Sequence, residues 1–226
     1  MADLHWGWVS VVSRRNTYLK KRPVELSALT NDEPVLPYDI NGHLNFLKDF
    51  PYIYQVSDDE QWKLSQSAAI TTVLCYLCTP TINSHDDYLK VVNKHGKPLS
   101  RHPNAKALSD LNVQASYSFS FDDQDIREEI DGGKPVITKL FIDGASSRPC
   151  GRYQYAVVTG YGEDYWLVQN PLGQLDIENG DFLDKGINSG KDNRYGFEHM
   201  NPRFMIEGGA TGECWFNFRV LSSVEI

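Results

Sequence analysis

The order of the secondary-structure patterns along the chain constrains the fold more than any other feature of the sequence. Segments with helical periodicity come first, and segments rich in β-branched and aromatic residues follow after Gly133. The longest helical segment begins near Ser67. Its apolar residues have the spacing of a helix packed on one side against a core, and they are Ile70, Val73, Leu74, Leu77 and Cys78. Helices followed by antiparallel strands predict an α+β fold.

Two shorter helices and four strands are predicted around this long helix. The helices cover residues 104–111 and 122–130, and the second has acidic residues in its first turn and two glycines after its end. The strands cover residues 134–142, 152–161, 164–170 and 213–221. A short Gly-rich link between the second and third strands predicts an antiparallel pair. Residues 173–212 have no clear pattern.

Residues 1–50 differ in character from the rest of the chain. They contain β-branched and aromatic stretches, two prolines within the segment PVLPYD and an Asn-Gly turn signal. These features indicate short strands joined by turns. We therefore predict two domains, a small all-β domain over residues 1–50 and a larger domain over residues 51–226.

Charge and composition exclude several classes of partner. The formal net charge is −8 over 226 residues. This argues against nucleic acid as a partner, because proteins that bind nucleic acid present a basic surface to the phosphates. No run approaches the roughly 20 apolar residues of a membrane helix, so we expect no membrane insertion. His85, Asp86 and Asp87 are interpreted as a surface turn and not as a metal site. We expect no metal and no cofactor.

Residues 50–221 resemble the papain-like double-glycine peptidases, a family of bacteriocin-processing enzymes with phage and bacterial relatives. The resemblance rests on the order and spacing of five segments: PYIYQVSDDEQWKLSQSAAITTVL, LSRHPNAKAL, GKPVITKLF, GRYQYAVVTGY and WLVQNPLG. Residues 1–50 resemble the small Src-homology-3-like barrel that precedes this domain in some cyanobacterial and cyanophage proteins. The resemblance implies a papain-like peptidase fold after a small barrel.

The same resemblance implies a catalytic site from which the reactive groups are missing. Gln55 matches the glutamine that helps to form the oxyanion hole, whereas the cysteine, histidine and aspartate positions fall on Ala68, Gln154 and Asn170. A methyl group cannot attack a carbonyl, and an amide neither takes nor returns a proton near neutral pH. An asparagine can orient a histidine in such sites, but here it would orient a glutamine. We therefore expect a protein that is not an enzyme.

The leading hypothesis is a non-catalytic pseudopeptidase that serves as a structural or binding module. The predicted groove holds an extended peptide or another protein subunit, and its lining is Gln55, Ala68, Gln154, Trp166 and Asn170. By family analogy, the expected setting is a bacteriophage virion, as a tail, baseplate or capsid accessory protein made in the host cytoplasm. This analogy does not come from residue chemistry.

Two alternatives remain open from the sequence. The first is an active peptidase or peptidoglycan-directed hydrolase with a relocated nucleophile. Cys75 lies about 10 Å further along the helix than Ala68, too deep for the site, and Ser67 has no identified base. The second is a phage protein that binds a host factor.

Overall fold

The computed structural model describes residues 45–55, 64–204 and 212–221. Residues 1–44 of the predicted all-β domain therefore lie outside the described residues. The last residues of that predicted domain, 45–50, pack on the strands that follow them. Strand β1 (Asn45–Phe46) pairs with the strand β4 of the following domain, and Leu47 and Phe50 are buried in its core.

The pairing of β1 depends on a close backbone approach at Gly160 of β4. A Cβ atom on Gly160 would lie 2.5 Å from the Cβ atom of Phe46 and 2.6 Å from the carbonyl oxygen of Asn45. Only a residue without a side chain fits at this distance. Residues 45–50 thus pack directly on the sheet of the larger domain.

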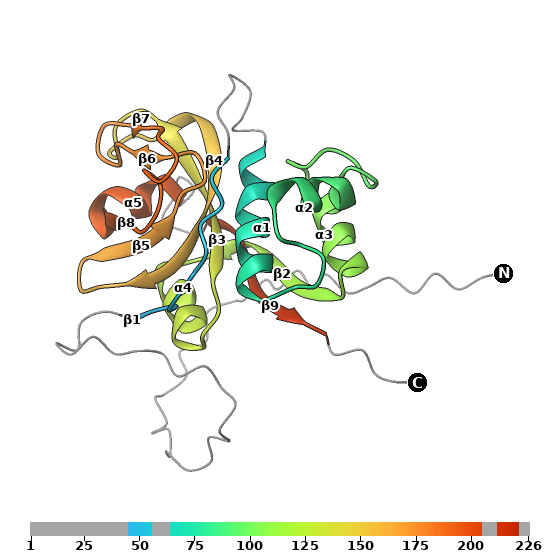
Figure 1. The fold of residues 1–226 in the computed structure, drawn as a ribbon. Helices are drawn as coiled ribbons and strands as arrows, with labels where there is room; N and C mark the ends of the chain where they lie inside the picture. The colour runs from blue at the N-terminus through green and yellow to red at the C-terminus, as the bar shows by residue number, and fades with distance from the viewer. Residues whose placement is uncertain (1–44, 56–63, 205–211, 222–226) are drawn as a thin grey trace, which may run out of the picture.

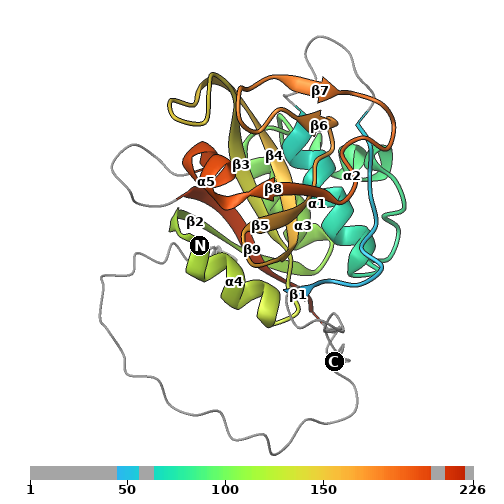
Figure 2. The same ribbon diagram turned by 90° about the vertical axis from the view of Figure 1, so that its left-hand side faces the viewer.

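Helices pack on both sides of the sheet. The helices of the described residues are α1 (Ser65–Tyr76), α2 (His85–Val92), α3 (Arg101–Asp110), α4 (Asp123–Asp131) and α5 (Phe197–Phe204). Figure 1 shows α1, α2 and α3 gathered on one side of the sheet, with α5 on the opposite side, and Figure 2 gives the view from the α5 side. None of the helices in these ranges combines the length and apolar character needed to cross a bilayer.

The main sheet is antiparallel throughout. Its path runs β2-β9-β3-β4-β5-β8, with β1 added to β4, and a separate ribbon pairs β6 with β7. The bounds are β2 (Val113–Phe121), β3 (Val136–Asp143), β4 (Cys150–Tyr161), β5 (Tyr165–Gln169), β6 (Gln174–Leu175), β7 (Phe182–Asp184), β8 (Asn193–Gly196) and β9 (Gly212–Val220).

The α+β fold predicted from the sequence is confirmed. All four predicted strands are present within two residues of their expected ends, and β4 and β5 form the predicted antiparallel pair. The sequence patterns missed β2, α2 and the elements between residues 173 and 212. Of these, α2 contains His85, Asp86 and Asp87, which were predicted to form a surface turn.

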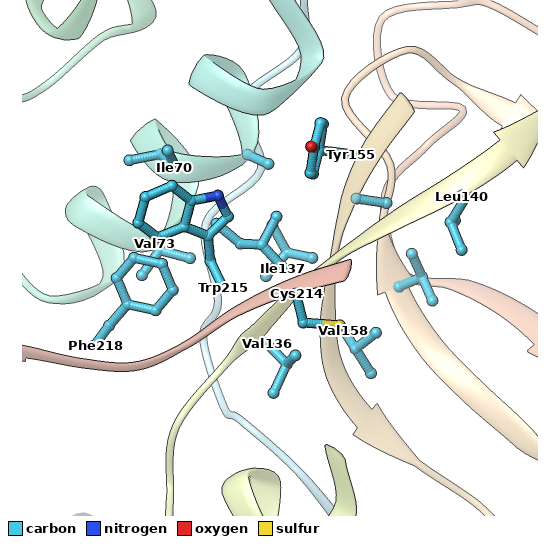
Figure 3. Packing of buried hydrophobic residues seen from close by; sticks show 14 of the residues in the cluster. Ile70, Val73, Val136, Ile137, Leu140, Tyr155, Val158, Cys214, Trp215 and Phe218 are labelled. Atoms are coloured by element: carbon cyan, nitrogen blue, oxygen red, sulfur yellow. The ribbon is translucent and has the colours of Figure 1, made fainter. Parts of the chain in front are cut away.

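One continuous hydrophobic core joins the helical group to the sheet. Figure 3 shows Ile70 and Val73 of α1 beside Trp215 and Phe218 of β9. The ring of Trp215 is fully buried and meets Tyr117 of β2 edge to face, with ring centroids 4.8 Å apart. Such pairs add to the stabilisation from burial, and this one joins β2 to β9 beneath α1.

A buried cationic side chain ties α5 to β3 and to the loops that follow β3 and β6. Arg203 is fully buried and donates hydrogen bonds to three backbone carbonyl oxygens: Ile177 at 2.7 Å, Phe141 at 3.1 Å and Gly144 at 2.9 Å. Burial lowers the pKa of Arg203, and the carboxylates of Asp176 and Asp143 oppose that shift. The guanidinium group supplies donors that these carbonyls would otherwise lack.

A second polar cluster connects four strands at Glu213 of β9. Its carboxylate accepts hydrogen bonds from the hydroxyls of Tyr155 (2.8 Å) and Tyr117, and from the ammonium group of Lys139 (2.8 Å). Burial alone would raise the pKa of Glu213. The three donors outweigh burial and hold this pKa below its ordinary value.

Replacing Glu213 by glutamine is expected to lower the free energy of unfolding at pH 7 by roughly 1–3 kcal/mol, the usual size for hydrogen bonds to a charged group. Because the folded-state pKa is depressed, the carboxylate contributes fully above its ordinary pKa of 4.5 and loses that contribution as the pH falls through the folded-state value. Urea unfolding of both proteins across this range should show the difference shrinking at acid pH. The exposed Glu163→Gln is the matched control, and a pH-independent difference for Glu213→Gln would contradict the argument.

Candidate functional site

Helix α1 begins at Ser65, two residues earlier than predicted, and this changes which residue occupies its N-terminus. Leu64 stands at the N-cap position and provides no side-chain cap. Ser65 is fully buried, and its hydroxyl oxygen accepts a hydrogen bond of 3.1 Å from the backbone N–H of Tyr155 in β4. The first residue of α1 is therefore held directly beside β4.

Ala68 does not occupy the position expected for the nucleophile. It is the fourth residue of α1, about 4.5 Å along the helix axis from Ser65, and it is fully buried. A nucleophile in a papain-like site was expected at the start of the helix. In this structure the side chain at the start is the hydroxyl of Ser65 and not the methyl group of Ala68.

Gln154 lies in β4 next to the residue that contacts Ser65. It is fully buried and pairs in register with Leu140 of β3. Neither its amide nitrogen nor its amide oxygen has a hydrogen-bond partner among the described residues. A buried amide without partners costs free energy, so such groups are uncommon in folded proteins. The unpaired amide occupies the position at which the resemblance implied a histidine.

Asn170 begins a tight turn directly after β5. The preceding residue, Gln169, pairs with Val157 of β4, which puts Asn170 near the part of β4 that contains Gln154. Its side-chain oxygen accepts from the N–H of Leu172 at 3.2 Å. In the same turn, the carbonyl oxygen of Pro171 accepts a 2.9 Å hydrogen bond from the backbone N–H of Gln55. Gln55 and the turn are therefore adjacent.

The backbone of Asn170 is fixed by contacts from two other segments. The hydroxyl of Tyr52 donates to its carbonyl oxygen at 2.9 Å, and its N–H donates to Gly190 at 2.8 Å. A Cβ atom on Gly190 would lie 1.8 Å from the carbonyl oxygen of Asn170, so only glycine permits this approach. Burial raises the pKa of the neighbouring Tyr195 to about 12, and hydrogen bonds from Leu175 and Asn170 moderate that rise.

Trp166 does not join the other predicted site residues. It lies in β5 opposite Tyr161, seven residues along β4 from Gln154, a separation of about 24 Å along a strand. Its side chain is fully buried, its indole N–H donates to Asn201 at 2.7 Å, and its ring packs on Phe197. Trp166 therefore belongs to the core at the far end of the sheet, and not to a groove.

The described residues do contain a serine and a histidine in contact, at a place the sequence analysis did not identify. The hydroxyl oxygen of Ser67 lies 2.8 Å from Nε2 of His85, the first residue of α2. The same hydroxyl donates to the carbonyl oxygen of Leu64 at 2.8 Å. Because a hydroxyl has one proton, His85 must then carry its proton on Nε2 and donate to Ser67.

This pair does not have the arrangement of a nucleophile and its base. Ser67 is fully buried, and in this tautomer Nε2 of His85 is a donor that cannot accept the hydroxyl proton. Burial lowers the pKa of His85 from 6.5 to about 4, against the opposing effect of Asp86. His85 is thus neutral at pH 7 and is a poor base. The other candidate, Cys75, is half-buried, and burial raises its pKa.

An open cavity of about 430 Å³ lies beside Gln55 and not over Gln154. It is bounded by the segment Tyr52–Gln55 on one side and by the start of α2 on the other. Its lining consists of Tyr52, Ile53, Tyr54, Gln55, Leu64, Asn83, Ser84, His85, Asp86 and Leu89. Of the five residues predicted to line a groove, Gln55 is the one that does so. Ala68, Gln154, Trp166 and Asn170 are fully buried.

No set of three or more His, Cys, Asp or Glu side chains is placed to hold a metal ion within residues 45–55, 64–204 and 212–221. His85 and Asp86 share the cavity wall, but Asp87 faces other partners. Its carboxylate accepts from Ser84 at 2.8 Å and from Lys90 at 3.2 Å. These contacts cap and stabilise α2.

Comparison with solved structures identifies the fold. A C39-like peptidase from Bacillus anthracis superposes with a TM-score of 0.52 at 12% identity, over 79% of this chain and 99% of the other. The peptidase domain of Streptococcus ComA, a bifunctional ABC transporter in a quorum-sensing pathway, gives 0.50 at 14% identity, over 76% and 99%. The chain has a papain-like peptidase fold. No protein-family description and no curated protein sequence matches the chain.

Within this papain-like fold the structure brings together Gln55, the N-terminus of α1, Gln154 and Asn170. Ala68 lies one helical turn deeper, and Trp166 lies elsewhere. The sequence did not indicate that Ser65 is the first residue of α1, or that His85 contacts Ser67 and lines the cavity. The pattern Ser84-x-x-Asp87 is a visible N-cap signal, and it could have located α2 and therefore placed His85 on a helix.

Proposed function

We propose that this chain is a pseudopeptidase, a papain-like domain that binds without cleaving. The observation that carries the proposal is the pair of groups at the start of α1 and in β4. Ser65 is the first residue of α1, its hydroxyl accepts from the N–H of Tyr155 next to Gln154, and both side chains are fully buried. Gln154 falls at the position where the resemblance implies the base. A hydroxyl needs a base to attack an acyl group, and an amide cannot serve as one.

Binding is proposed at the cavity beside Gln55. Its walls combine tyrosine rings, an imidazole, a carboxylate and aliphatic side chains, a mixture typical of sites that hold small polar groups of a ligand. An extended peptide or the surface segment of another subunit fits such a site. The virion setting remains part of the proposal, and it rests on the resemblance of residues 1–50 to barrels of cyanophage proteins.

The experiment tests hydrolysis and nucleophile reactivity together. The purified full chain is incubated with a mixed peptide substrate, with peptidoglycan and with a fluorophosphonate probe, and labelled sites are mapped by mass spectrometry. We expect no cleavage and no modification of Ser65 or Ser67. If the unlabelled chain cleaves a substrate, and labelling of either serine abolishes that cleavage, the chain is a hydrolase with a relocated nucleophile and the proposal is overturned. His85→Ala is the control, because it should change neither result if Ser67 is not a nucleophile.

A further inference from the structure

The hydroxyl groups in the walls of the cavity beside Gln55 already donate to other groups. The hydroxyl of Tyr52 donates to Asn170 at 2.9 Å, and that of Tyr54 donates to the carbonyl oxygen of Lys185 at 2.6 Å. Ser84 donates to Asp87 at 2.8 Å. The two tyrosines therefore have their hydroxyl protons engaged elsewhere, and a ligand meets their rings and oxygen lone pairs.

The imidazole of His85 adds an acceptor to this wall. Because Nε2 carries the proton donated to Ser67, Nδ1 keeps its lone pair. Nδ1 has no hydrogen-bond partner among the described residues. The lowered pKa of about 4 keeps the ring neutral at pH 7, so that this acceptor persists under ordinary conditions.

The carboxylate of Asp86 supplies the negative charge at the cavity wall. Asp86 is exposed and forms no ion pair with any described residue. The lysine on the same helix, Lys90, contacts Asp87 instead, at 3.2 Å. Lys185 places its ammonium group over the ring of Phe182, 4.7 Å from the centroid. The charge of Asp86 is therefore available to a ligand, and the chain's net charge of −8 favours the approach of a cation.

These features determine which chemical group of a ligand the cavity can bind. A carboxylate, a neutral nitrogen acceptor and aromatic rings together favour a group that is positively charged and rich in N–H donors. We infer that the cavity binds an ammonium or guanidinium group of a peptide. Asp86 is the counter-ion, and His85 accepts a hydrogen bond from the bound group. The rings of Tyr52 and Tyr54 form the walls. This inference rests on the proposed binding role and names the group that the bound peptide must present.

The test uses small probes that differ only in the charged group. Binding of Nα-acetyl-lysine methylamide to the full chain is measured by NMR and compared with Nα-acetyl-norleucine methylamide, which has the same shape without the ammonium group. Glycine methylamide, with a free α-ammonium group, distinguishes a peptide N-terminus from a lysine side chain. We expect at least tenfold tighter binding of one of the two amines than of the norleucine probe.

Two variants locate the binding in the cavity. Asp86→Asn should weaken binding of the amine about tenfold, whereas Asp123→Asn, also in the first turn of a helix, should leave it unchanged. Leu89→Trp should abolish binding by filling the cavity, because Leu89 is part of its lining. Thermal unfolding of each variant checks that the fold is retained.

Three results would overturn the inference: binding of neither amine more tightly than the norleucine probe, full binding by Asp86→Asn, or no binding of any amine at millimolar concentration. None of these would affect the pseudopeptidase proposal, which the cleavage and labelling experiment decides separately. Conversely, a hydrolase that bound the amine probes would overturn the pseudopeptidase proposal and leave the cation site intact.

Discussion

Introducing Ser65→Cys together with Gln154→His is expected to create a thiol that ionises far more readily than the one in Ser65→Cys alone. The hydroxyl of Ser65 is held against the backbone of β4 at Tyr155, next to Gln154. A histidine at residue 154 would stabilise a thiolate at residue 65, and the N-terminus of α1 would add to this effect. We expect the pKa of the thiol to fall by about two units relative to the single variant, roughly a hundredfold in thiolate below both values.

Absorbance at 240 nm as a function of pH measures thiolate formation without requiring a reagent to reach the buried site. Gln154→His alone gives the background from the native cysteines at positions 75, 78, 150 and 214. The matched comparison is Ala68→Cys with Gln154→His, which places the thiol one turn further into α1. A larger fall in pKa for that protein would show that residue 68, and not residue 65, faces residue 154.

Replacing Arg203 by methionine is expected to give the largest loss of stability of any single change considered. The substitution would leave the carbonyl oxygens of Ile177, Phe141 and Gly144 without their buried donor. Each unsatisfied buried acceptor costs about 1–3 kcal/mol, so a total loss of about 3 kcal/mol or more is expected. For a chain of this size such a loss lowers the melting temperature by roughly 10 °C.

Thermal unfolding followed by circular dichroism measures the effect of Arg203→Met. Arg194→Met is the matched control, because Arg194 of β8 is exposed and packs over the ring of Tyr165. Arg203→Lys should fall between wild type and Arg203→Met, since one ammonium group cannot reach three separated carbonyls in the geometry of a guanidinium. A melting temperature within 2 °C of wild type for Arg203→Met would contradict the assigned role.

The fold could be predicted from the sequence because it depends on local patterns and their order. Apolar spacing in residues 70–78 defined α1, and the short link after Tyr161 defined the β4–β5 pair. The start of α1 could not be predicted in the same way. Ser65 is the first residue of the helix, and its hydroxyl accepts a hydrogen bond from Tyr155, ninety residues later in the chain. No local pattern in the sequence reports that contact.

The candidate site was predictable in part for the same physical reason. Gln154 and Asn170 were located through the resemblance of the segments GRYQYAVVTGY and WLVQNPLG, and the pairing of β4 with β5 places them near each other. The cavity and the contact between Ser67 and His85 depend on how α2 packs against α1. Side-chain burial was also not predictable, and for this reason the expected groove lining included four residues that are fully enclosed.

The short strand β1 has a mechanical consequence. The chain leaves the N-terminal region through Asn45 and Phe46, which are fastened to Tyr161 and Gly160 of β4. A force applied at Asn45 therefore reaches β4, the strand that holds Gln154, through these pairs. A fragment cut at residue 51 would lose this anchor, along with the buried side chains of Leu47 and Phe50.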